Sequence, residues 1–191
     1  MNKYNPNIHH RRSIRLKDYD YSQSGLYFIT ICCQDKICRF GKIENTEMIL
    51  NELGIIAHNE WGKLPERYPN VELNAFQIMP NHIHGIIMLN TVGAGFTPAQ
   101  YNENRTTANM ATTNRTTARV APTIGDIVGA YKSLVANGCL DIYKTKNEIM
   151  GKLWQRNYYE HIIRNEQSYQ NISEYILNNP TKWLDDKFYT I

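Results

Sequence analysis

The order of predicted strands and helices indicates a single α+β domain built on an antiparallel sheet. The chain has 191 residues, enough for one domain with a sizeable core but few for two. Segments rich in β-branched and aromatic residues predict strands, and apolar residues spaced three and four apart predict helices. The predicted strands are 25–33, 71–79, 82–89 and 153–163, and the predicted helices are 47–64, 123–139 and 166–178.

The first strand and the first helix are predicted from composition and spacing. Segment 25–33 is nearly all apolar, aromatic or β-branched, as expected for a buried strand. Segment 47–64 has helical spacing and ends before Pro65 and Pro69. Its apolar positions are Ile49, Leu50, Leu53, Ile56, Ala57, Trp61 and Leu64.

The remaining elements complete a recognisable order. Pro80 and Asn81 form a turn that joins the second and third strands into a hairpin. Thr123, with Asp126 three residues later, is an N-cap signal for the second helix, and Pro180 ends the third. The order β-α-β-β-α-β with an additional C-terminal helix predicts a ferredoxin-like fold. In that fold the helices pack on one face of the sheet, the other face stays available for ligands, and the 82–89 strand lies near the middle.

Two segments fall outside this pattern. Residues 1–24 form a basic N-terminal arm in which Arg11, Arg12, Arg15 and Lys17 are followed by tyrosines, a composition suited to single-stranded nucleic acid. The same composition is typical of a solvated arm. Residues 91–122 are poor in large apolar side chains and repeat the sequence NRTTA, which indicates a flexible insertion within the 25–191 domain.

Composition narrows the class of protein. The net charge of +3 is compatible with a nucleic-acid partner without requiring one. The four cysteines contain no C-x-x-C pair and lie partly in an apolar stretch, so no disulfide framework is predicted. No apolar run approaches membrane-spanning length, and no signal peptide precedes the arm. We therefore expect a cytoplasmic protein without a membrane partner.

Two histidines one residue apart are the most informative motif. His82 and His84 would project from the same face of the predicted strand, a spacing that suits metal ligation but also occurs on solvated strands. On the last helix, Tyr175 and Asn179 are four apart and share a face. Two imidazoles and an amide oxygen could hold a divalent cation that polarises a phosphodiester. Tyr175 would then be the nucleophile and would form a covalent link.

The motifs occur together in one order: MPNHIH at 79–84, WQRNYYEHIIR at 154–164 and YILNNP at 175–180. In this combination the chain resembles the REP-associated tyrosine transposases, from about residue 25 to 183 without the insertion. The resemblance implies that His82, His84 and Asn179 bind Mg²⁺ or Mn²⁺ and that Tyr175 is the nucleophile. It also implies cleavage of single-stranded DNA near hairpins through a 5′-phosphotyrosine intermediate. Homodimers are a further possibility, because related transposases are dimeric.

Several alternatives remain at this stage. Tyr158, Tyr159 and Tyr169 are rival nucleophiles, the first two on a predicted strand where aromatic residues usually pack. Strand alternation allows either Glu160 or His161, but not both, to face the site. Lys132 on the second helix is a candidate phosphate contact. Other functions are a non-catalytic single-stranded nucleic-acid-binding module and a metal-dependent phosphodiesterase that uses water.

Overall fold

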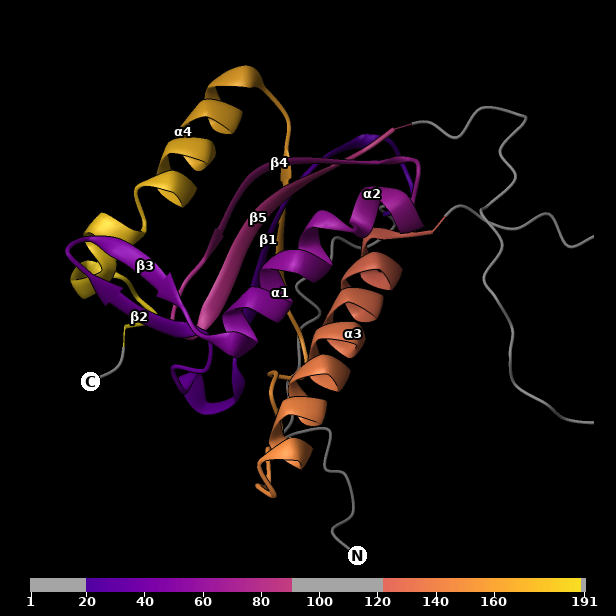
Figure 1. Cartoon of the computed structure of the whole chain (residues 1–191). Coiled ribbons are helices and arrows are strands. Elements are labelled where there is room, and N and C mark those ends of the chain that lie inside the picture. Colours follow the sequence, from indigo (N-terminus) through magenta and orange to yellow (C-terminus); the bar gives the residue numbers. More distant parts are fainter. Residues whose placement is uncertain (1–19, 91–121, 190–191) are drawn as a thin grey trace, which may run out of the picture.

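The computed structural model describes residues 20–90 and 122–189. Four strands form one sheet in the order β4-β5-β1-β6, and each neighbouring pair is antiparallel. The strands are β1 (Gly25–Cys32), β4 (Val71–Ile78), β5 (His82–Leu89) and β6 (Tyr159–Ile163). This order is that of a ferredoxin-like sheet, so the predicted α+β class is confirmed, with the histidine strand in an internal position (Figure 1).

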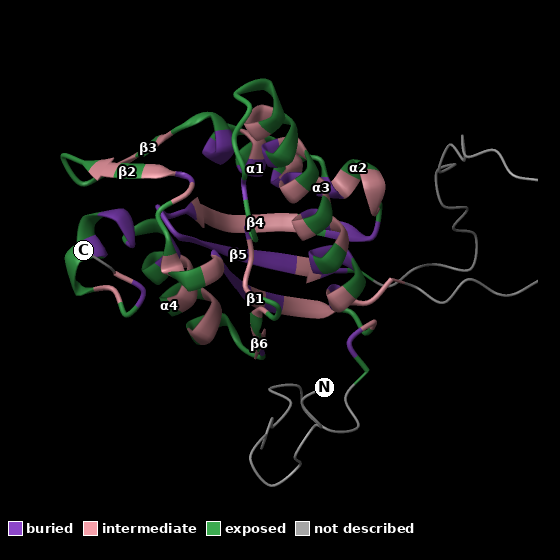
Figure 2. Ribbon diagram, turned by 90° about the horizontal axis from the view of Figure 1, so that it is seen from below, coloured by how far each residue is buried: buried purple, intermediate pink, exposed green. Residues whose placement is uncertain are grey.

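The two faces of the sheet carry different helices. Helices α1 (Glu52–Gly62) and α3 (Ile124–Thr145) cover one face, and α4 (Glu166–Leu177), the additional helix, lies against β4 and β5 on the other (Figure 1). Alternation along β5 sends Ile83 and Ile87 into the larger core and Ile86 into the smaller cluster under α4. Strand β5 is therefore buried on both faces (Figure 2). The face expected to be available for ligands is partly covered by α4.

The first predicted helix is wrong at its start. Residues Glu47–Leu50 form β3, which pairs with β2 (Gly41–Glu44) through a turn at Asn45 and Thr46. Both turn residues have positive φ, 49° and 64°, as a tight primed hairpin turn requires. The helix begins only at Glu52, because the side chain of the N-cap residue Asn51 accepts hydrogen bonds from two backbone amides of the first turn. A short helix, α2 (Leu64–Arg67), follows.

The other predicted boundaries shift less. Thr123 caps α3 in a reciprocal capping box with Asp126, as predicted, but the helix runs to Thr145. Strand β6 begins at Tyr159 because Trp154 pairs separately with Cys33 and the residues between form a loop. Pro180 opens a 3₁₀ helix, η2 (Pro180–Asp185), directly after α4, and a shorter 3₁₀ turn, η1 (Gln34–Lys36), follows β1. The N-terminal arm up to residue 19 and insertion residues 91–121 lie outside the described residues.

In the part of the chain that the structure describes, none of the helices has the length and apolar character needed to cross a membrane.

Gly85 on β5 is a position where the fold depends on a missing side chain. A Cβ there would lie 2.7 Å from Cη2 of Trp61 and closer still to Cζ2. Trp61 cannot move aside because its ring stacks on Phe76 at 4.6 Å and meets Tyr131 edge-on at 5.3 Å. We predict that Gly85→Ala lowers the free energy of unfolding by about 1–3 kcal/mol in urea titrations.

Gly129 provides the matched control, since it lies in α3 and a Cβ at that position would meet nothing within 4 Å. Gly129→Ala should leave stability unchanged or raise it by up to about 1 kcal/mol, because alanine favours the helix over the unfolded chain. Equal effects of the two substitutions would contradict the packing argument.

Candidate active site

The two histidines of β5 face each other beneath α4. Their Nε2 atoms are 3.0 Å apart, and both side chains are almost fully buried. His82 Nδ1 lies 2.8 Å from Asn81 Oδ1, an amide oxygen that can only accept a hydrogen bond. Nδ1 of the neutral ring therefore carries the proton, and Nε2 of His82 has a free lone pair. His84 Nδ1 lies 2.8 Å from the hydroxyl of Thr30, its direct partner on β1, which can serve either tautomer. Two ring nitrogens thus converge on one point, each ring oriented by a polar neighbour.

Burial keeps both imidazoles neutral. Desolvation, followed by the positive charges of Lys187 and Lys36, lowers the pKa of His82 to about 3. Desolvation also holds the pKa of His84 well below its ordinary value. Since a metal binds neutral imidazole, the pair is in its ligating form throughout the physiological range.

Tyr175 brings a hydroxyl to this pair from α4. Its Oη is 3.2 Å from His84 Nε2, and Phe28 on β1 packs against its ring edge-on. The side chain remains 40 % exposed, so a large substrate can reach the hydroxyl. Desolvation and the nearby Asp186 carboxylate raise the pKa of Tyr175 to about 12, so the hydroxyl is protonated at neutral pH.

Asn179 lies one turn beyond Tyr175, where α4 passes into η2, and it is buried. Its Nδ2 donates to Asp186 Oδ2 at 3.1 Å. Its Oδ1 is buried and has no hydrogen-bond partner among the described residues. Buried carbonyl oxygens are rarely left unsatisfied, so this one is available for a ligand.

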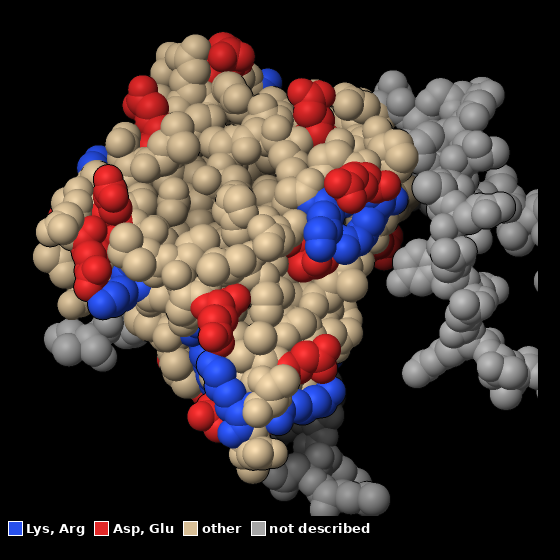
Figure 3. Space-filling view, viewed as in Figure 1, with Lys and Arg blue, Asp and Glu red and all other residues tan. Residues whose placement is uncertain are grey.

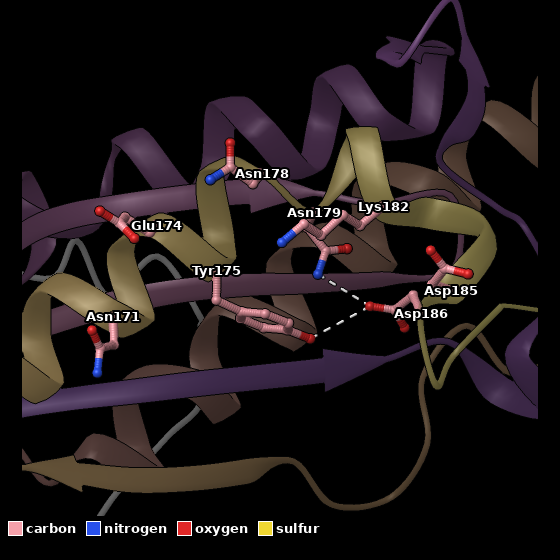
Figure 4. Close-up of a pocket in the computed structure, with 8 residues that line it drawn as sticks. All are labelled: Asn171, Glu174, Tyr175, Asn178, Asn179, Lys182, Asp185 and Asp186. Atoms are coloured by element: carbon pink, nitrogen blue, oxygen red, sulfur yellow. Dashed lines mark hydrogen bonds between the residues drawn. The ribbon is translucent and has the colours of Figure 1, made fainter.

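Asp186 is the site residue that the sequence did not predict. Its Oδ2 accepts hydrogen bonds from Asn179 and, at 3.4 Å, from Tyr175 (Figure 4). One ligand atom from each of His82, His84 and Asp186 lies within 4.8 Å of the other two. Asp186 follows the short 3₁₀ helix η2 and lies outside any strand or α-helix, so no periodic pattern in the sequence marks it.

A pocket of about 310 Å³ opens beside this group. It is lined by α4 and η2, through Asn171, Glu174, Tyr175, Asn178, Asn179, Lys182, Asp185 and Asp186. Tyr175 and Asn179 therefore stand between the buried histidines and a solvent-open pocket large enough to admit part of a nucleotide chain.

The C-terminal segment covers the other side of the histidine pair. The Phe188 ring lies 4.6 Å from that of His82, and its carbonyl accepts a hydrogen bond from Asn81 Nδ2 at 2.8 Å. Lys36 and Lys187 flank the Phe188 ring, and their ammonium groups lie 5.7 and 4.8 Å from the centroid of that ring. These two lysines place positive charge beside the site and were also not predicted.

Comparisons with known proteins were consistent with the motifs. No family model matches the chain. An uncharacterized protein of Haemophilus influenzae is 45% identical over 189 residues, covering 98% of this chain and 97% of the relative. A second Haemophilus influenzae protein, described as "putative REP-associated tyrosine transposase", is 25% identical over 164 residues, 85% of this chain and 74% of that protein. The chain is thus similar over most of its length to a protein described as a REP-associated tyrosine transposase.

The solved structures that match include that of a REP-associated tyrosine transposase bound to a REP hairpin. It aligns with a TM-score of 0.49 and 18% identity, over 88% of this chain and 74% of that one.

The remaining residues considered from the sequence are placed as follows. The register of β6 puts His161 opposite Phe28, on the face of α4, and Glu160 on the other face. His161 is nevertheless exposed, and Glu160 accepts a hydrogen bond from the Tyr158 hydroxyl. Tyr159 is exposed on β6.

The basic residues expected to contact nucleic acid lie in two different parts of the chain. Lys132 Nζ donates to the backbone carbonyls of Gln155, Arg156 and Asn157, at 2.7 to 3.3 Å, and so holds the loop before β6. Arg11, Arg12, Arg15 and Lys17 lie outside the described residues. Charged side chains on the face shown in Figure 3 form small mixed groups rather than one broad basic patch. DNA contact by all five of these basic residues stays a prediction.

The buried imidazoles predict a dependence of stability on pH. The unfolded chain binds protons on both histidines as the pH falls through about 6.5, whereas folded His82 does so only near 3. The free energy of unfolding should therefore fall between pH 7 and pH 5, by up to roughly 1.4 kcal/mol per pH unit for each histidine. Urea titrations in EDTA at pH 7, 6 and 5 measure this slope.

The slope should be shallower in His84→Gln, which removes one buried imidazole. A wild-type stability that is flat from pH 7 to 5 would show that the histidines are not buried as neutral groups.

Proposed function

We propose that the chain is a metal-dependent transposase-like enzyme that cuts and rejoins single-stranded DNA through Tyr175. One observation carries the proposal: the Tyr175 hydroxyl lies 3.2 Å from a buried, paired imidazole, within the same chain. The similarity to a protein described as a REP-associated tyrosine transposase supports an enzyme of this kind. The resemblance of its motifs to that family indicates hairpin-forming DNA as the substrate.

The residues present fit a divalent cation. His82 and His84 offer converging ring nitrogens, and Asn179 Oδ1 is a buried oxygen without a hydrogen-bond partner among the described residues. This mixed nitrogen and oxygen set is compatible with Mn²⁺ or Mg²⁺. When bound, the cation would supply Lewis-acid polarisation of the scissile phosphodiester.

The chain's own residues would carry out the nucleophilic step. Tyr175 Oη attacks the phosphorus, a bond forms between them, and the bond from phosphorus to the 3′ oxygen breaks. The tyrosine proton passes to solvent, which the half-exposed side chain contacts, and the leaving oxygen takes up a proton to become a 3′-OH. The 5′-phosphotyrosine conserves the energy of the diester, so attack by another 3′-OH can reverse the step and join a new strand.

The raised pKa of Tyr175 means that the nucleophilic step requires help in removing the hydroxyl proton. A phenol with a pKa near 12 is a poor nucleophile at neutral pH, so the hydroxyl must lose its proton with help from positive charge in the assembled site. The ammonium groups of Lys36 and Lys187 lie beside His82 and would also attract the substrate phosphates. Single-stranded DNA is thereby drawn to the buried end of the site.

We predict that Tyr175→Phe abolishes the covalent adduct. The assay mixes the protein with Mn²⁺ and labelled single-stranded hairpin DNAs and resolves protein-linked DNA on a denaturing gel. The adduct should also disappear in EDTA. DNA binding should be nearly unchanged, because the substitution removes only a hydroxyl.

Tyr169→Phe is the matched control on the same helix. The Tyr169 hydroxyl donates to Asn74 Oδ1 at 3.0 Å, away from the histidines, so its loss should cost about 1 kcal/mol of stability and leave the adduct in place. An adduct that survives Tyr175→Phe would refute the assignment of the nucleophile. Cleavage by wild type without an adduct would favour hydrolysis by water, and metal-independent binding alone would favour a binding module.

A further inference from the structure

The proposed cation site lacks a negative charge among its three predicted ligands. Imidazole ligates a metal in its neutral form, so His82 and His84 bring no charge to the cation, and the Asn179 amide brings none either. The nearby ammonium groups of Lys36 and Lys187 add positive potential at His82. A divalent cation buried among neutral groups and close to two lysines would be poorly stabilised, since a buried charge needs an opposite charge close by.

Asp186 is placed to supply that charge. Its carboxylate lies with the two imidazoles in a group whose ligand atoms are within 4.8 Å of one another. Its Oδ2 is directed at Asn179 and Tyr175, whereas the carboxylate of the neighbouring Asp185 points away from these two side chains (Figure 4). Mn²⁺ and Mg²⁺ prefer carboxylate oxygen to uncharged donors.

Hydrogen bonds to residues before and after Asp186 in the sequence hold the carboxylate in this position. Its other oxygen, Oδ1, accepts a hydrogen bond from the Phe188 amide at 2.6 Å, and the Asp186 amide donates to the Trp183 carbonyl. Trp183 and Phe188 are themselves buried, and the Phe188 carbonyl is tied to Asn81, the residue before His82. The segment is thus anchored to the strand that carries the histidines, and Oδ2 is pre-oriented.

We infer that Asp186 is a fourth protein ligand of the cation, bound through Oδ2, with His82, His84 and Asn179. This inference rests on the metal site of the proposed function and adds to it the only anionic ligand and a residue of the C-terminal segment. The 3.4 Å contact with Tyr175 is weak, so exchanging it for a cation costs little and frees the tyrosine hydroxyl.

A direct test is titration of Mn²⁺ into the full chain without DNA. The paramagnetic resonance signal of free Mn²⁺ gives the bound fraction and does not depend on catalysis. We expect Asp186→Asn to weaken binding by about tenfold or more, because an anionic ligand becomes neutral. Asp185→Asn makes the same charge change one residue earlier and should alter the affinity by less than about twofold.

A double-mutant cycle separates a ligand from a residue that only positions Asn179. If Asp186 acts solely through its hydrogen bond with Asn179, Asp186→Asn should have no further effect in the Asn179→Ala background. A ligand should weaken Mn²⁺ binding again in that background. Equal affinities there, or an Asp186→Asn affinity equal to wild type, would overturn the inference.

Folding and the proposed function are controlled separately. Asp186→Ser keeps a short oxygen for the Phe188 amide but removes the carboxylate, so it should also weaken Mn²⁺ binding even if Asp186→Asn folds poorly. Thermal unfolding without metal reports whether each variant is folded. Wild type that binds no Mn²⁺ would refute the metal site itself. Binding that is indifferent to Asp186, with an intact DNA adduct, would refute only the fourth ligand.

Discussion

The contact between the two neutral imidazoles is the interaction on which the rest of the site depends. His82 and His84 can lie 3.0 Å apart only if they are not both charged, and burial under α4 favours the neutral form of each. Thr30 and Asn81 then fix the ring orientations. A slip of one residue in the pairing of β1 with β5 would send both rings into the opposite core, so sheet register and site are specified together.

Helix α4 converts this buried pair into a site. Ile176 packs into the small apolar cluster beneath α4 and so fixes the rotation of the helix about its axis. The preceding residue, Tyr175, therefore lies at the edge of that cluster, partly exposed toward the pocket. The continuation into η2 brings Asn179 and then Asp186 against the same point. All the candidate groups come from one chain, so the proposed chemistry requires no second copy to complete its geometry.

Much of this was accessible from sequence because it depends on local periodicity. The strand that carries the histidines was predicted with its observed bounds, His82–Leu89, and the capping pair Thr123 and Asp126 was predicted as observed. The hairpin β2–β3 was missed because its apolar residues also fit helical spacing, and only the Asn51 cap decides between the two. Asp186 was missed for a different reason, since its role arises from a non-periodic turn that brings distant residues together.

The features that make the site costly to fold are those that its chemistry would use. A buried amide oxygen without a hydrogen-bond partner among the described residues and two imidazoles kept from protonation oppose folding. Each is also an electron-pair donor directed at the same small volume. A cation there would satisfy all of them at once, so the fold tolerates locally unfavourable groups that become favourable ligands together. The same argument explains why Thr30 and Asn81, which touch no substrate, are as important to the arrangement as the donors that they orient.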